Sequence, residues 1–212
     1  MIKQRRRFAP GVFIAAAFAS LMLALGMSGT LGAFVATITN TDNTAATGTL
    51  TMQETNAAGT IVCTSDSSPT NVANCSTINK YGGTTNPLIP GTPVTTTVKI
   101  KNTGSIPATV FTMDGKVCTQ SDANGAGFSG TATDLCSKIN VLIKQGSTTV
   151  YSGTAAAFAT APAVDVLTVL GTTSVAPAAE LSFDITVTLD SSANSTHQGL
   201  QISQPIEWTF QA

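Results

Sequence analysis

The sequence predicts an all-β fold, an antiparallel two-sheet sandwich or jelly roll, preceded by an N-terminal signal peptide helix. The chain is rich in Thr, Ser, Ala, Gly and Val, and only 10% of its residues are charged. Thr and Val favour half-buried pleated surfaces, whereas the charged helix formers are scarce. Short segments of alternating apolar residues recur between turn formers, with almost no helical periodicity. This alternation is too regular for the alternative, a disordered Thr/Ser-rich stalk.

The first 33 residues have the pattern of a secretory signal peptide. Four basic residues within residues 3–7 precede an apolar run over residues 11–27 and a small-residue zone over 29–33. We expect cleavage between Ala33 and Phe34. The alternative is a retained transmembrane anchor, because the run extended to Ala33 is long enough to cross a bilayer. No basic stop-transfer cluster follows it, so we expect a secreted protein that meets the membrane only through its signal peptide.

Cleavage would leave residues 34–212 as a single β-sandwich domain. That portion contains six lysines, no arginine and eleven acidic residues, which gives a formal charge of −5. Nucleic-acid binding requires clustered cations that displace counterions. The charge balance therefore excludes nucleic acid as a partner.

Each strand is expected from its own alternation. In the first one, Phe34, Ala36 and Ile38 share a face, and in the clearest one, residues 181–189, five apolar side chains do so. Gln145-Gly146-Ser147 predicts a hairpin turn, residues 80–93 are dense in turn formers, and residues 154–163 predict a short helical turn or a loose crossover. In chain order, the expected strands cover residues 34–40, 48–53, 60–64, 94–102, 108–113, 139–144, 149–151, 164–170, 181–189 and 206–210.

Four cysteines, Cys63, Cys75, Cys118 and Cys136, indicate two disulfides in an exported chain. Three connectivities are possible, and we favour the local pairs Cys63–Cys75 and Cys118–Cys136. Each would close a Gly/Ser/Asn-rich loop and contribute about 3 kcal/mol. A zinc site is the alternative, but the sequence has no CxxC pair.

Catalytic chemistry finds little support in the sequence. His197 is the only histidine and is expected in a polar, solvated loop, so neither an HExxH zinc site nor a Ser-His-Asp triad can be assembled. Asp184 and Asp190 are expected on the outer face or at the end of a strand, and Trp208 in the core. We therefore expect a non-enzymatic protein with no catalytic residue, metal or cofactor.

Three segments carry a resemblance to the TasA/camelysin family. Residues 29–52, GTLGAFVATITNTDNTAATGTLTM, resemble the family's G-T-x-A-x-F junction followed by a G-T-L-x-[LM] strand. Residues 88–94 with 98–105 resemble its L-x-P-G-x and N-x-G-[ST] block, and residues 183–189 with 197–210 resemble its closing strands. The cysteine loops and residues 154–163 depart from the pattern and indicate an actinobacterial-like relative.

The resemblance implies export and trimming by an ER-type signal peptidase, and a jelly-roll subunit of biofilm-matrix fibres at the surface of a bacterium. In such fibres the N-terminal strand of one subunit fills a groove of the next, so that the partner is a second copy of the chain. The alternatives are a monomeric secreted or cell-surface binding module, in which this strand closes its own sheet, and a camelysin-like metalloprotease. The resemblance assigns the donor strand to Phe34, Val35, Ala36, Thr37, Ile38, Thr39 and Asn40.

Overall fold

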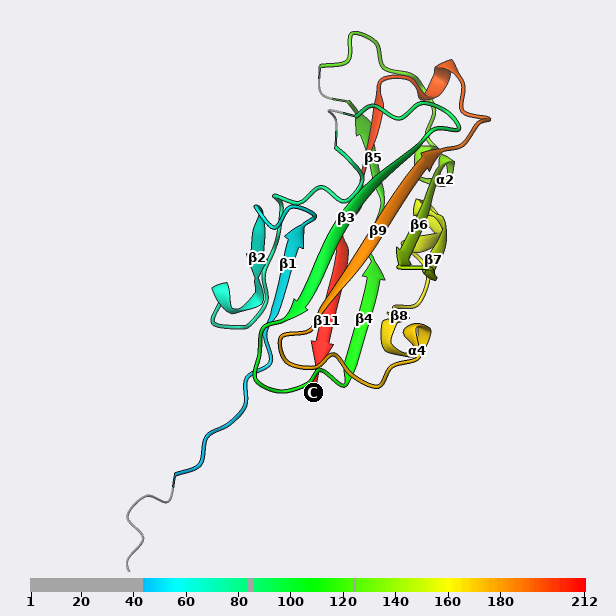
Figure 1. Cartoon of the computed structure of the whole chain (residues 1–212). Coiled ribbons are helices and arrows are strands. Elements are labelled where there is room, and N and C mark those ends of the chain that lie inside the picture. Colours follow the sequence, from blue (N-terminus) through cyan, green and yellow to red (C-terminus); the bar gives the residue numbers. More distant parts are fainter. Residues whose placement is uncertain (1–43, 84–85, 124) are drawn as a thin grey trace, which may run out of the picture. The chain divides into compact units, whose positions relative to one another are not determined.

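The computed structural model describes residues 44–83, 86–123 and 125–212. Within them, residues 47–212 form one compact unit (Figure 1). Its paired strands all run antiparallel, so the predicted all-β class is confirmed at the level of antiparallel sheets. The predicted signal peptide, the Ala33–Phe34 junction and the strand 34–40 lie outside the described residues.

The larger sheet contains six strands in the order β2-β1-β3-β9-β6-β7. The alternation of residues 181–189 places the longest apolar face of this sheet on β9, which pairs with β3 on one side and β6 on the other. The hairpin predicted around Gly146 joins β6 to β7. The strands are β1 (Met52–Asn56), β2 (Val62–Thr64), β3 (Pro93–Asn102), β6 (Ile139–Gln145), β7 (Thr148–Thr154) and β9 (Glu180–Leu189).

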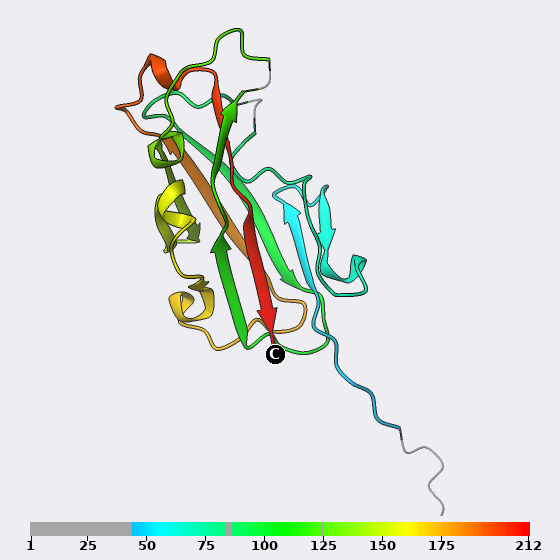
Figure 2. The ribbon, with the colours of Figure 1, turned by 180° about the vertical axis from the view of Figure 1, so that it is seen from behind.

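A three-stranded sheet and a two-stranded ribbon make up the rest of the β-structure. The sheet has the order β11-β4-β8, and in the ribbon β10 pairs with β5. β4 leads into β5, and β10 leads into β11. The sheet and the ribbon therefore share one long antiparallel pair of chain segments, which is interrupted at Lys116 and Pro205 (Figure 2). The strands are β4 (Val110–Gly115), β5 (Thr119–Asp122), β8 (Val164–Asp165), β10 (Leu200–Ser203) and β11 (Ile206–Gln211).

Alternate side chains of both sheets meet in one core. Phe183 on β9 lies against Phe111 on β4 and Trp208 on β11, with ring centroids 6.0 and 4.9 Å apart. On the opposite face of the sheet, β9 carries Ser182, Asp184, Thr186 and Thr188, which alternate with its buried apolar residues. The fully buried side chains include Val98, Ile100, Phe111, Met113, Val141, Ile143, Phe183, Ile185 and Val187.

The prediction of a strand over residues 164–170 is wrong. Only β8 is extended there, and α4 (Val166–Leu170) follows it. The carboxylate of Asp165 caps this helix by accepting hydrogen bonds from Thr168 N and Thr168 Oγ1, and Gly171 ends it in the left-handed conformation. These local caps override the β-propensity of the apolar run.

The other helices are short. Of the two alternatives predicted for residues 154–163, a helical turn or a loose crossover, the structure has the helical turn, α3 (Ala155–Phe158), and Thr154 caps it by accepting from Ala157 N. α2 (Leu135–Lys138) and the 3-10 turns η1 (Ser65–Ser67) and η2 (Ser195–His197) complete the set in the described part of the chain. None of the helices described is long and apolar enough to cross a membrane.

The turn after β3 fixes the entry of the chain into β1. Asn102 is fully buried and its side-chain amide donates to Ile106 O and Val175 O, while its oxygen accepts from Gly104 N. Gly104 lies so close to the segment before β1 that an added Cβ would be 2.8 Å from Leu50 Cα. Residues 48–51, predicted as strand, therefore run beside this turn, and the strand itself starts at Met52.

Candidate functional site

β11 is an edge strand with a free side. β4 is its only partner among the described strands. Lys116 N donates to Pro205 O at 2.9 Å, so Pro205 occupies a hydrogen-bonded position opposite the β4 side. In an antiparallel pair, bonded and non-bonded positions alternate along each strand. The N–H and C=O groups of Ile206, Trp208 and Phe210 therefore point away from β4, toward the open edge.

A groove of about 1660 Å³ with a mixed polar and apolar lining adjoins this edge and continues past Gln204 to Leu200 and Gln198. One wall is formed by the inward residues of β10 and β11, which keep the period of two across Pro205. The opposite wall comes from β1 and the residues just before it. The residues that the two walls contribute are Leu200, Ile202, Ile206, Trp208 and Phe210 on one side, and Leu50, Met52 and Glu54 on the other.

Aromatic rings form the inner end of the wall on β11. Phe111 on β4 lies 5.7 Å from Trp208 and 4.8 Å from Phe210, measured between ring centroids. Trp208, predicted as a core residue, thus both packs on the core and lines the groove. Its indole Nε1 is buried and has no hydrogen-bond partner among the described residues, which is uncommon for a buried donor.

The segment of residues 78–81, called the bridging segment below, connects the two walls. Lys80 Nζ lies 2.8 Å from Glu54 Oε1 on β1. The hydroxyl of the next residue, Tyr81, donates to Gln204 Oε1 at 2.7 Å, two residues before β11. Ile78, at the start of the segment, is buried in the core.

Gln204 is itself held firmly. Its side-chain amide donates to Lys116 O at 2.8 Å and to Ala155 O at 2.9 Å. Burial, together with the neighbouring Tyr151, raises the pKa of the Tyr81 phenol well above its ordinary value, so Tyr81 stays a neutral donor. Polar contacts of Lys80 and Tyr81 to opposite walls therefore hold the bridging segment in place.

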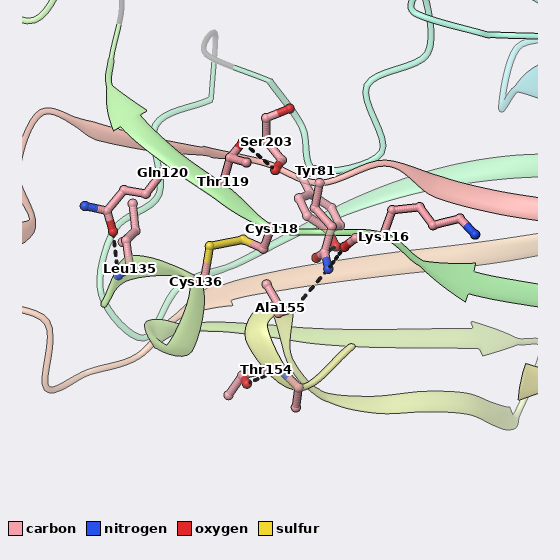
Figure 3. Close-up of a disulfide and its surroundings, with 12 residues drawn as sticks. Tyr81, Lys116, Cys118, Thr119, Gln120, Leu135, Cys136, Thr154, Ala155 and Ser203 are labelled. Carbon is pink, nitrogen blue, oxygen red and sulfur yellow. Dashed lines mark hydrogen bonds between the residues drawn. A yellow bond between two sulfur atoms is a disulfide. The ribbon is translucent and has the colours of Figure 1, made fainter. Parts of the chain in front are cut away.

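Both disulfides favoured from the sequence are present. Cys63 on β2 is bonded to Cys75, which precedes the bridging segment, and their Cα atoms are 6.0 Å apart. Cys118 is bonded to Cys136 on α2 with a Cα separation of 6.2 Å. Figure 3 shows the second bond beside the hydrogen bond from Leu135 N to Gln120 Oε1.

His197 does not lie in solvent as the sequence indicated. Its side chain is only 7% exposed, with Nε2 3.0 Å from Asp134 Oδ1, and its Nδ1 accepts from Asn194 N at 3.3 Å. The ring therefore links η2 to the residue before α2. A backbone hydrogen bond from Ala132 N to Thr196 O joins the same two segments. Within the described ranges, no three His, Cys, Asp or Glu side chains gather as a metal site would require.

The two aspartates considered for chemistry occupy solvent-facing positions, as predicted. Asp184 lies on the outer face of β9 and accepts from the Thr97 hydroxyl at 2.6 Å. Asp190 follows β9, and hydrogen bonds from the Ser192 hydroxyl and N–H hold the pKa of its carboxyl below the ordinary value. Both bind neighbouring hydroxyls and neither faces the groove.

The signal-junction residues and the strand 34–40 cannot be placed, because they lie outside the described residues. The groove and the bridging segment were missed from the sequence. The only available signal was the alternation of Leu200 and Ile202 continuing into β11 across Pro205.

Fold and site together define an antiparallel β protein in which the edge strand β11 borders a groove. No protein-family model matches the chain, and a search of curated proteins found none significantly similar to it.

Proposed function

We propose that this chain is an exported structural subunit that assembles with copies of itself into extracellular fibres. In these fibres, residues 34–40 of one copy add a strand to the free edge of β11 in the next copy. The observation that carries the proposal is the open edge of β11, whose residues Ile206, Trp208 and Phe210 line the adjoining groove. An exposed edge of this kind pairs with another chain unless something covers it.

Length and periodicity support residues 34–40 as the occupant. β11 has six residues and the expected strand has seven, so both span about 20 Å. Phe34, Ala36 and Ile38 would recur at the spacing at which Ile206, Trp208 and Phe210 line the groove. The added backbone would bond the edge groups of β11 and would bring acceptors close to Trp208.

The proposal includes membership in the TasA/camelysin family, a jelly-roll fold, and removal of the signal peptide before Phe34. The two disulfides support an oxidising environment outside the cytoplasm. The protein would then be located in the extracellular matrix or at the surface of a bacterium. No catalytic role forms part of the proposal.

A second candidate is a monomeric secreted module whose strand 34–40 fills its own groove. Thr49 O accepts from Ser105 N, and Gln211 O accepts from Thr109 N. One connection, between β3 and β4, therefore holds both the entry to β1 and the end of β11. The residues before Thr49 start near the groove, so a strand from the same copy could also reach it.

Electron microscopy of residues 34–212 tests the proposal. We expect filaments from the intact mature chain and none after deletion of residues 34–40. Phe34→Asp with Ile38→Asp should also abolish them, whereas Thr37→Asp, on the other face of the strand, should not. Sedimentation that stays monomeric at every concentration would reject fibres and favour the second candidate. N-terminal sequencing of secreted material checks cleavage before Phe34.

A further inference from the structure

The larger sheet ends in a segment that adds no buried side chain to the core. Residues 57–77, called the flap below, leave β1 and form β2 and η1 at the edge of the sheet (Figure 1). None of their side chains is buried, and those of Val62 and Val72 are 51% and 67% exposed. Hydrophobic burial therefore contributes little to holding the flap in place.

Polar contacts attach the flap to β1 and to the residues just before it. β2 pairs with β1 over three residues only. Ser65 Oγ accepts from Met52 N at 2.9 Å, and Asn71 Nδ2 donates to Leu50 O at 2.7 Å. A segment held by few buried apolar contacts and by hydrogen bonds near solvent opens at a low cost in free energy.

The Cys63–Cys75 bond is the only covalent cross-link of the flap. Cys63 lies opposite Glu54 in the β1–β2 register, and Cys75 precedes Lys80, the cation that binds Glu54. The bond therefore closes a ring of contacts that runs from β1 through the flap to the bridging segment. Both cysteines are half-buried and line the groove. Without the bond, the flap would depend on its hydrogen bonds.

The second disulfide has a different setting. Cys118 packs against the core, and Cys136 lies on α2 between Leu135 and Ile139, which are 4% and 2% exposed. Leu135 N also donates to Gln120 Oε1 at 2.8 Å. Core packing thus keeps Cys118 and Cys136 close together without the bond, which favours its re-formation. We therefore expect a dithiol to reduce this bond less readily than the bond of the flap.

We propose that the flap is redox-controlled: the Cys63–Cys75 bond fastens it beside the groove, and a dithiol reductant releases it. A thiolate of the dithiol attacks one sulfur of the bond and displaces the other, and the second thiolate then displaces the protein by closing the dithiol's own disulfide. Cys63 and Cys75 thereby gain the two electrons and two protons of two thiols. Release removes β2 from β1, so that β1 becomes an edge strand and the groove loses part of its wall.

Hydrogen exchange under graded dithiothreitol tests the proposal. Monomeric chains of residues 34–212 are reduced and alkylated, and both alkylation and amide exchange are read by mass spectrometry. We expect Cys63 and Cys75 to be alkylated at a concentration of dithiothreitol lower by about tenfold or more than Cys118 and Cys136 require. At that lower concentration, exchange in the flap should rise by about tenfold or more while β9 stays protected. Reoxidation should restore the protection of the flap.

Two results of this titration would overturn the proposal. One is reduction of both disulfides at the same concentration of dithiothreitol. The other is a flap that stays protected after Cys63 and Cys75 have been alkylated. Because the chains are monomeric, neither result depends on whether the protein assembles into fibres.

A variant that carries Cys63→Ser with Cys75→Ser mimics the released state without a reductant. We expect rapid exchange and thermolysin cleavage within its flap, with no further response to dithiothreitol. Cys118→Ser with Cys136→Ser is the matched control, and it should keep both the protected flap and its response to the reductant. A protected flap in the first variant, or an unresponsive one in the control, would contradict the assignment of the switch to Cys63–Cys75. The titration of the wild-type chain decides the question even where a variant does not fold.

Discussion

Lys80 Nζ lies 2.8 Å from Glu54 Oε1, and this buried ion pair joins a segment rich in turn formers to an interior position of β1. Glu54 is paired with Ile100, a fully buried residue of β3, so its carboxylate is directed to the core side of the sheet. A carboxylate in this position depends on its cation. The pair therefore fixes where the bridging segment crosses the groove.

Glu54→Gln should destabilise the fold strongly. The substitution leaves the Lys80 ammonium buried without a counter-charge, and we expect a loss of about 3–5 kcal/mol in the free energy of unfolding. Urea unfolding measures it, through a lower midpoint at an unchanged slope. Replacing both partners, as Glu54→Met with Lys80→Met, should recover most of the loss.

The exposed pair Lys99–Glu180 provides the matched control. Its atoms are 3.7 Å apart and its side chains are 33% and 43% exposed. Lys99→Met should change stability by less than about 1 kcal/mol. Equal effects at the two pairs would show that burial of Glu54 and Lys80 does not determine their contribution.

Tyr81→Phe should change the alkaline limit of stability. Burial raises the pKa of the Tyr81 phenol in the folded state above its unfolded value near 10. The folded protein therefore holds its proton longer than the unfolded chain, and the resulting stability is present below about pH 10 and is lost as pH rises further. We expect the wild-type free energy of unfolding to fall above pH 10 by up to about 1.4 kcal/mol per pH unit from this group.

The Tyr81→Phe variant should lose that part of the slope. It should also be less stable near neutral pH by about 1–2 kcal/mol, because Gln204 Oε1 loses its donor. Denaturant unfolding at several pH values, with the tyrosinate absorbance followed in parallel, measures both effects. An unchanged alkaline slope would contradict the assigned burial of Tyr81.

Removing the Cys118–Cys136 bond should destabilise the end of the molecule that carries β5 and α2. The bond closes a loop with a sequence separation of 18 residues. A Cys118→Ser, Cys136→Ser double variant should lose about 2–4 kcal/mol in thermal unfolding. The Gln120 contacts to this loop do not depend on the bond, so the far-UV circular dichroism of the variant should still show β-structure.

Gly104→Ala should be poorly tolerated although the residue is in a turn. An added Cβ would lie 2.8 Å from Leu50 Cα and 2.9 Å from Thr51 N, and neither backbone atom can move freely. We expect a loss of about 1–3 kcal/mol or more, measured by urea unfolding. Gly127→Ala is the control, because nothing lies within 4 Å of its added Cβ, and it should change stability by less than about 0.5 kcal/mol.

Periodic segments were predictable from the sequence. The alternation over residues 181–189 located β9, and the glycine in Gln145-Gly146-Ser147 located the turn between β6 and β7. These succeeded because the signal is local and repeats several times. The local cysteine pairs are likewise present. The strand predicted over residues 164–170 was wrong because the Asp165 carboxylate caps a helix in this apolar run.

The groove was not predictable, for a different physical reason. Tyr81 binds Gln204, 123 residues away in sequence, and a run of turn formers around Tyr81 gave no indication of a buried contact. β5 and β10 have four residues each and carry too little alternation to distinguish them from loops. Sites built from such long-range pairs leave no periodic trace.

The bond between Cys63 and Cys75 gives the bridging segment a dependence on its surroundings. Thiols kept reduced in a cytosol would leave β2 and the chain ahead of Ile78 untethered. The walls of the groove would then be tied together by the contacts of Lys80 and Tyr81 alone until that bond forms.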